Sequence, residues 1–145
     1  MIAFDTNVLI HAHRVDSPFY PRAVEAVSAA ANSQQAWAIP WPCVDEFLAV
    51  STHPRIFNTP SPPEAALEQV EAWLESPSLN LLSEDNGYFR GFSDLVRNGA
   101  VRGPKVHDAR IAALCLFFGV SVLYTADRDF SRFPALKTKN PLVAR

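Results

Sequence analysis

Two kinds of hydrophobic pattern alternate along the 145-residue chain. Short apolar runs predict β-strands, and longer segments with apolar residues at helical spacing predict amphipathic α-helices. Strands are expected at residues 2–5, 37–40, 79–82, 120–125 and 136–138. Helices are expected at residues 7–14, from Ser17 onward, from Pro42 onward, and at residues 61–74, 86–98 and 106–118.

The regular alternation of strands and helices is typical of a parallel sheet with helices on both faces. We therefore expect an α/β protein with three α/β/α layers and a central, mostly parallel sheet of four to five strands. Residues 1–145 are expected to form a single domain, because no repeat or strong boundary divides the chain. Thr6, Ser17 before Pro18, and Ser61 in a capping box with Glu64 are expected to cap three of the helices.

Composition and charge narrow the class of protein. The chain is 48% hydrophobic and 19% charged, which is typical of a globular protein. Its net charge of −2 argues against a sequence-specific DNA-binding module, which is usually basic. Cys43 and Cys115 both lie in apolar stretches, so we expect buried thiols in a reducing compartment. The start of the chain lacks the pattern of an export signal, and the longest apolar run, residues 111–120, is too short to span a bilayer. We therefore expect a cytoplasmic protein that is not embedded in a membrane.

Acidic residues follow or flank several of the predicted strands. Asp5 ends the first strand, and Asp45 and Glu46 lie on the helix after the second. Asp108 lies in the first turn of the helix before the strand at 120–125, and Asp127 and Asp129 follow that strand. Ligands of open parallel sheets bind at the carboxyl ends of the strands, so these acids are expected to meet at one edge.

Clustered carboxylates repel one another unless a cation compensates them. Oxygen ligands suit Mg²⁺, with Mn²⁺ as a possible substitute, and such a site favours phosphoryl transfer or phosphodiester hydrolysis. When each acid is considered by itself, it also has a purely structural interpretation, as a helix cap, an exposed helix residue or a turn residue. Their joint position at one edge favours the metal site.

Four segments of the chain resemble the motifs of PIN domains, in the order of that family. They are an acid followed by Thr-Asn and an apolar run, a second acid on an early helix, a third acid at a helix start, and a strand followed by Thr-x-Asp-x-Asp-Phe. In this chain they are Phe4–Ile10, Pro42–Phe47, Val106–Ala113 and Leu123–Phe130. The single-domain layout looks most like the VapC-type toxins of toxin–antitoxin pairs.

The resemblance implies a PIN-like fold and a magnesium-dependent endoribonuclease that hydrolyses RNA, forms a homodimer and binds a cognate antitoxin protein. It implies that four acids surround the metal: Asp5, Asp108 and Asp127 as ligands, with Glu46 as a further catalytic acid. Thr6, Asn7 and Thr125 would donate hydrogen bonds to the carboxylates. Asp129 would either bind the metal or orient its neighbours.

Other residues allow more than one interpretation. Arg110, Arg128 and Arg132 lie beside two of the motifs and are candidates either for RNA-phosphate binding or for ion pairs. Histidines such as His107 are expected to be surface or hydrogen-bonded residues, because the sequence lacks a zinc-type His/Cys pattern. The aromatic stretch from Tyr88 to Phe92 is a candidate antitoxin or dimer surface.

Two rival functions share a strand-end aspartate with this chain. A haloacid-dehalogenase-like phosphatase needs Asp-x-Asp at the first strand, but Thr6-Asn7 follows Asp5 here. A receiver-like signalling module needs paired acids on its first strand and a phosphoacceptor on its third, and Ser83–Asp85 is only a weak match for the latter. Neither rival explains Glu46 and Asp108 on helices.

Overall fold

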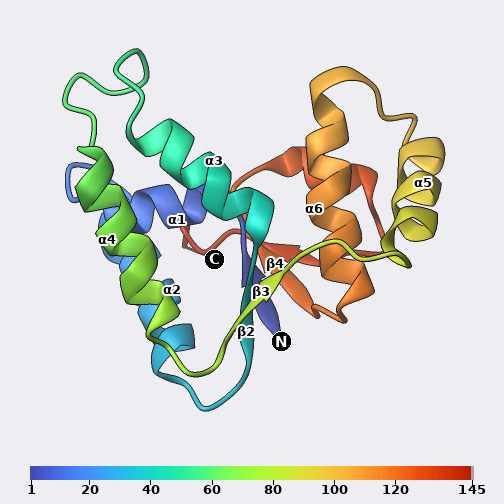
Figure 1. Ribbon diagram of the computed structural model, residues 1–145, viewed down its shortest axis with the longest axis horizontal. Helices are drawn as coiled ribbons and strands as arrows, with labels where there is room; N and C mark the ends of the chain where they lie inside the picture. Colours follow the sequence, from blue (N-terminus) through green and yellow to red (C-terminus); the bar gives the residue numbers. More distant parts are fainter. Residues whose placement is uncertain (145) are drawn as a thin grey trace.

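The computed structural model describes residues 1–144 and contains five strands in one parallel sheet (Figure 1). The sheet order is β3-β2-β1-β4-β5, and all four strand pairs are parallel. The strands are β1 (Ile2–Phe4), β2 (Trp37–Pro40), β3 (Leu79–Leu82), β4 (Val122–Tyr124) and β5 (Thr138–Lys139). This confirms the predicted α/β class and the parallel sheet of four to five strands.

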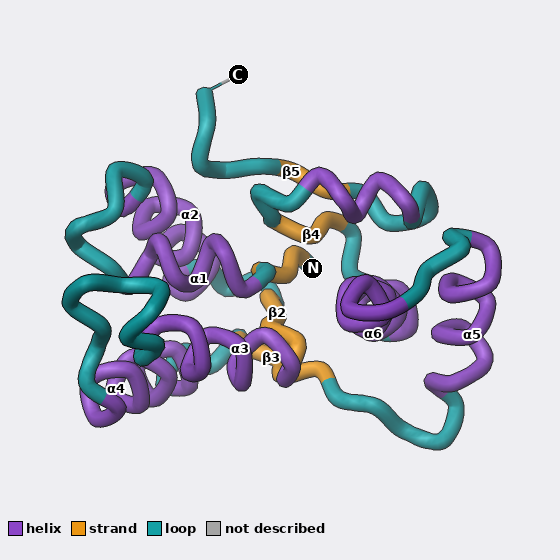
Figure 2. The backbone as a smooth tube through the Cα atoms, turned by 90° about the horizontal axis from the view of Figure 1, so that it is seen from above, coloured by secondary structure: helices purple, strands orange, loops and turns teal. Residues whose placement is uncertain are grey.

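Within residues 1–144, six α-helices connect the strands and cover both faces of the sheet. They are α1 (Thr6–His13), α2 (Tyr20–Asn32), α3 (Trp41–Ser51), α4 (Pro63–Leu74), α5 (Tyr88–Asn98) and α6 (Val106–Phe117). Figure 2 shows α1 to α4 on one side of the strands and α5 and α6 on the other, so the three predicted layers are present. Short 3₁₀ helices follow α5 and β4, namely η1 (Gly103–Lys105) and η2 (Arg128–Arg132). None of the helices within residues 1–144 is long and apolar enough to cross a membrane.

The core lies on both faces of the central strands. β2 is buried at every position, as expected for a strand covered by helices on both sides. Phe4 of β1 packs edge-on against Trp37 and Tyr124, with ring centroids 5.8 and 5.3 Å apart. This packing fixes the central strands whose carboxyl ends carry the acidic residues. Cys43 and Cys115 are free and buried, as the sequence predicted.

Several predicted element boundaries are wrong. The second helix begins at Tyr20 rather than at Ser17, whose Oγ accepts a hydrogen bond from the Phe19 backbone N–H at 3.0 Å in a preceding turn. Ser61 does not cap α4, because Pro62 occupies the N-cap position. Instead, the Ser61 hydroxyl contacts His13 Nε2 at 3.0 Å and accepts from Arg14 at 3.3 Å.

The remaining differences are smaller. Asp5 rather than Thr6 occupies the N-cap of α1. The helix predicted from Pro42 onward begins at Trp41. The short helix η1 lies between the helices predicted at residues 86–98 and 106–118, and the last strand is β5 at Thr138–Lys139 rather than 136–138. The strand predicted at 120–125 is limited to Val122–Tyr124.

Candidate active site

The order in which successive strands are added to the sheet reverses between β1 and β4. The chain places β2 and β3 on one side of β1, and β4 and β5 on the other, so this pair is a topological switch point. In open α/β sheets the crevice beyond the carboxyl ends at such a point is the usual ligand site. Phe4 and Tyr124 are paired there, and the backbone N–H of Asp5 donates to the Tyr124 carbonyl oxygen at 3.0 Å. The end of β1 therefore holds Asp5 beside Thr125.

A hydrogen-bond network around Thr125 joins the ends of β1 and β4. The Thr125 hydroxyl donates to Asp5 Oδ2 at 2.7 Å and accepts from the Asp127 backbone N–H at 3.0 Å. Asn7 Nδ2 contacts both the Thr125 hydroxyl and Asp5 Oδ2 at 3.2 Å, and Asn7 Oδ1 accepts from the Ala126 N–H at 3.0 Å. These bonds fix the side chain of Asp5 and the backbone leading to Asp127.

Thr6 contributes to this network through its backbone alone. Its N–H donates to Asp5 Oδ1 at 2.8 Å, which makes Asp5 the cap of α1. The Thr6 hydroxyl is buried without a hydrogen-bond partner among residues 1–144. Asn7 and Thr125 therefore donate to the carboxylate by their side chains, whereas Thr6 does so by its main chain.

Asp5 is a buried carboxylate, with only 4% of its surface exposed. Burial raises the pKa of Asp5, hydrogen bonds from Thr125 and Thr6 oppose that rise, and the negative charge of Glu46 adds to it. The Cys43 thiol lies 3.6 Å from Asp5 Oδ1, and burial, together with the charge of Asp5, raises the pKa of that thiol. The Cys43 thiol therefore acts as an uncharged contact of Asp5.

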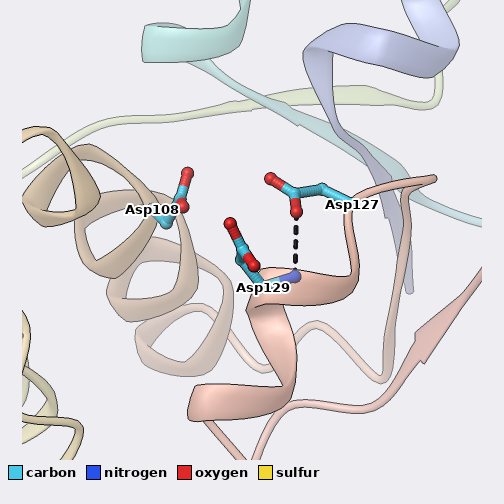
Figure 3. Close-up of side chains that lie close together, drawn as sticks. All are labelled: Asp108, Asp127 and Asp129. Carbon is cyan, nitrogen blue, oxygen red and sulfur yellow. Dashed lines mark hydrogen bonds between the residues drawn. The ribbon is translucent and has the colours of Figure 1, made fainter.

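Three further carboxylates gather beside this network (Figure 3). Asp108 lies in the first turn of α6, Asp127 caps η2, and Asp129 lies in the first turn of η2. Each offers an oxygen atom within 4.8 Å of those of the other two, and all three residues are half-buried. Asp127 Oδ1 accepts from the Asp129 backbone N–H at 2.8 Å, so η2 holds these two acids in a fixed relation. The cluster combines segments that are far apart in the sequence, as the sheet edge predicted.

The electrostatics of Asp108 link this cluster to Asp5. Burial raises the pKa of Asp108 to about 6, and the negative charges of Asp127, Asp5 and Asp129 contribute to the rise. The ammonium of Lys105 opposes it from 4.0 Å away. Uncompensated negative charge is therefore concentrated at Asp108, where a cation would be most stabilising. The residues present fit a hard divalent cation, since the donors are carboxylate oxygens.

Glu46 is not part of the group formed by Asp108, Asp127 and Asp129. Both Asp45 and Glu46 are exposed on α3, so burial does not separate the two. Glu46 lines a groove of about 300 Å³ between α3 and α6, together with His107 and Arg110. Its charge still reaches Asp5, whose pKa it helps to raise. A larger cavity of about 610 Å³ lies between α2 and the strands and contains none of these acids.

The basic residues divide into two groups. Arg110 pairs with Glu84 next to the groove, and this pair lowers the pKa of the Glu84 carboxyl. Arg128 and Arg132 are exposed on η2 and form no ion pair within the described part of the chain. Sequence reasoning missed Lys105, which pairs with Asp129 and thereby lowers the pKa of Asp129. Its spacing of three residues from Asp108 was an available signal.

The aromatic stretch on α5 is only partly exposed. Tyr88 and Phe92 are half-buried and stack with ring centroids 5.3 Å apart. Phe89 is 67% exposed. His107 is exposed, whereas His11 and His13 are hydrogen-bonded to neighbouring side chains, as expected for structural histidines.

Comparison with known proteins agrees with this fold. The PIN domain family model matches residues 2–136. Ribonuclease VapC48 of Mycobacterium tuberculosis (strain ATCC 25618 / H37Rv) is 30% identical over 138 residues, which cover 95% of this chain and 95% of that protein. The chain therefore belongs to the PIN domain family. This confirms the resemblance seen in the four sequence motifs and disfavours the phosphatase and receiver alternatives.

Solved structures show the same fold. DNA-bound VapBC from Salmonella typhimurium matches with a TM-score of 0.67 and 20% identity, over 97% of this chain and 97% of that one. Mycobacterium tuberculosis VapC20, described as a Sarcin-Ricin loop cleaving toxin, matches with a TM-score of 0.66 and 17% identity, over 90% and 93% of the two chains. At these identities the likeness concerns the fold.

Proposed function

We propose that this chain is an endoribonuclease that hydrolyses RNA phosphodiester bonds with Mg²⁺, or with Mn²⁺ as a substitute. The observation that carries the proposal is the group of three carboxylates, Asp108, Asp127 and Asp129, beside buried Asp5 at the switch point of the sheet. Membership of the PIN domain family and the ribonuclease relative support it.

The acidic and polar residues of the site would have different roles according to their positions. Asp108 and Asp127 would hold the ion together with Asp5, whose charge already acts on Asp108. A divalent ion bound there would activate water as a nucleophile and stabilise charge on the phosphate and leaving oxygens. Thr125 and Asn7 would keep the acids in place, because their side chains connect the carboxylate of Asp5 to the segment that leads to Asp127.

Glu46 would act at the open side of the site. It is exposed on α3, lines the groove together with His107, which precedes Asp108 in the sequence, and would accept a proton or orient the attacking water. Arg128 and Arg132 would contact RNA phosphates, because they are exposed on the same short helix that carries Asp129. Arg110 is a weaker candidate for RNA binding, since its guanidinium is paired with Glu84.

The activity is tested by cleavage of a structured RNA with purified protein. Wild type should cleave with Mg²⁺, and EDTA should stop the reaction. Asp108→Asn and Asp127→Asn should each lower the rate by a factor of about 100 or more, because a ligand charge is lost. Glu46→Gln should lower the rate without changing stability, since Glu46 is exposed. Asp94→Asn, an exposed acid on α5, is the matched control and should cleave at the wild-type rate.

We also propose that the chain is the toxin of a toxin–antitoxin pair, acts in the cytoplasm and forms a homodimer. The toxin role is supported by likeness to proteins of toxin–antitoxin pairs, among them a toxin-antitoxin complex from Klebsiella pneumoniae with a TM-score of 0.64 and 17% identity. Expression alone should slow bacterial growth, and co-expression of a cognate inhibitor should restore it. A harmless wild-type chain that cleaves RNA in vitro would refute the toxin role and leave the nuclease role standing. Sedimentation of the purified chain tests the dimer.

A further inference from the structure

Lys105 reaches into the group of carboxylates from a different element. It ends η1 and stands directly before α6, so that its side chain lies three residues ahead of Asp108 on the helix. Its ammonium pairs with Asp129 and lies 4.0 Å from Asp108 Oδ2. A single cationic side chain therefore contacts an acid on η2 and faces another on α6.

A second metal ion would need carboxylate oxygens from the same group of acids that Lys105 contacts. Sites with two metals place the ions about 3.5–4 Å apart and share carboxylates between them. Asp108, Asp127 and Asp129 offer oxygen atoms within 4.8 Å of one another, which is a suitable span for such sharing. The Lys105 ammonium, however, is paired with Asp129 Oδ2 and lies 4.0 Å from Asp108 Oδ2. A divalent ion bound by Asp129 would have to displace a charge of the same sign.

We propose that Lys105 takes the place of a second metal ion, holding Asp129 away from metal binding and limiting the site to one divalent ion at Asp108 and Asp127. The inference rests on the metal site in the proposed function. It assigns Lys105 a positioning role, because the residue acts through Asp129 and through the number of ions bound. It also makes Asp129 a partner of Lys105 rather than a ligand in the wild-type protein.

The opposing interpretation is an ordinary surface ion pair. Lys105 and Asp129 both keep 43–44% of their side chains exposed, and exposed pairs contribute little to stability. In that case, removal of the lysine would leave the number of bound ions unchanged. The two interpretations therefore differ in metal stoichiometry, which can be measured without RNA.

The experiment is a calorimetric titration of the full chain with Mn²⁺, supported by electron paramagnetic resonance. Wild type should bind about one ion, and Lys105→Met should bind about two, with the spectrum of a magnetically coupled Mn²⁺ pair. The double variant with Lys105→Met and Asp129→Asn should return to one ion. Lys137→Met removes the same charge from an exposed position on the approach to β5 and should bind one ion. Lys105→Gln repeats the test with a polar side chain in case the methionine variant folds poorly.

The possible outcomes distinguish the role of Lys105 from the existence of the metal site. One ion in both Lys105 variants, or two ions in wild type, would overturn the inference. If wild type nevertheless cleaves RNA with Mg²⁺, the proposed function stands despite that result. A wild-type protein that binds no Mn²⁺ would contradict the metal site itself, and the role of Lys105 would fall with it.

Discussion

Replacement of Asp108 by asparagine should stabilise the metal-free protein near neutral pH. The pKa of Asp108 is raised from 3.8 to about 6, first by burial and then by the charges of Asp127 and Asp5. A shift of about two units corresponds to roughly 3 kcal/mol of unfavourable charge in the folded state. Since 21% of the side chain remains in water, which screens this charge, we expect a gain of about 1–3 kcal/mol. That is a rise in Tm of about 3–10 °C for a domain near this size.

The pH dependence follows from the sign of the shift. Because Asp108 binds its proton more tightly in the folded protein than in the unfolded chain, its stabilising contribution is complete below about pH 4 and is lost as the pH rises through about 6. The difference in Tm between Asp108→Asn and wild type should therefore be small at pH 4, grow between pH 4 and 6, and stay constant above. Thermal melts in EDTA across this range measure it.

Asp5→Asn should have the opposite effect, although Asp5 also has a raised pKa. Its carboxylate accepts from the Thr6 N–H, Asn7, Cys43 and Thr125, and an amide nitrogen cannot accept in their place. We therefore expect Asp5→Asn to have a lower Tm than wild type, with a free energy of unfolding that is lower by about 1–3 kcal/mol.

Two further measurements complete this test. Mg²⁺ at ten times its dissociation constant should add about 1.4 kcal/mol to wild type and less to Asp108→Asn. Asp94→Asn, which removes an exposed charge, should melt within about 0.5 kcal/mol of wild type. Unfavourable charge at Asp108 is refuted if Asp108→Asn melts lower than wild type at pH 7.5 in EDTA, or if the difference in Tm does not depend on pH.

Three other substitutions test separate parts of the structure. Thr125→Val should lower the free energy of unfolding by about 1–3 kcal/mol, because it removes a buried hydroxyl that both donates and accepts, whereas Thr125→Ser should stay close to wild type in urea denaturation. Arg14→Lys should lower the free energy of unfolding by about 1.5–3 kcal/mol in the same assay, because the buried guanidinium donates hydrogen bonds to three partner residues. An equal loss of stability in Arg90→Lys, at an exposed position, would contradict this. Arg128→Gln and Arg132→Gln should each weaken single-stranded RNA binding and reduce its logarithmic salt slope by about 0.7 per lost phosphate contact. An unchanged slope would argue against a phosphate-binding role for these arginines.

The order of the strands could not be predicted from the sequence, but the position of the acids at one edge of the sheet could be. Asp5 follows β1, Asp127 follows β4, and parallel strands bring such ends to one edge. The prediction required only the alternation of strands and helices, because parallel pairing follows from it. The register of Phe4 with Tyr124, which sets the Asp5–Thr125 contact, depends on side-chain packing in the core and is not encoded in local pattern.

Failures of the sequence prediction involve residues whose partners are distant in the chain. The sequence around Ser61 predicts a helix cap, but its hydroxyl contacts His13 and Arg14, which lie 48 and 47 positions away, respectively. Lys105 pairs with Asp129 only because η2 is placed beside the start of α6. Local propensity carries no information on such contacts, so they emerge only with the tertiary structure.

The most direct test of the proposed activity is the chemistry of the RNA ends after cleavage. A water nucleophile leaves a linear monophosphate at the cut, whereas attack by the neighbouring ribose 2′-hydroxyl leaves a 2′,3′-cyclic phosphate. We predict Mg²⁺-dependent cleavage whose products carry linear monophosphates, measured by mass spectrometry of one cleaved RNA. Cleavage that persists in EDTA, or that leaves 2′,3′-cyclic phosphates, would contradict a metal-dependent hydrolase built on Asp5, Asp108 and Asp127.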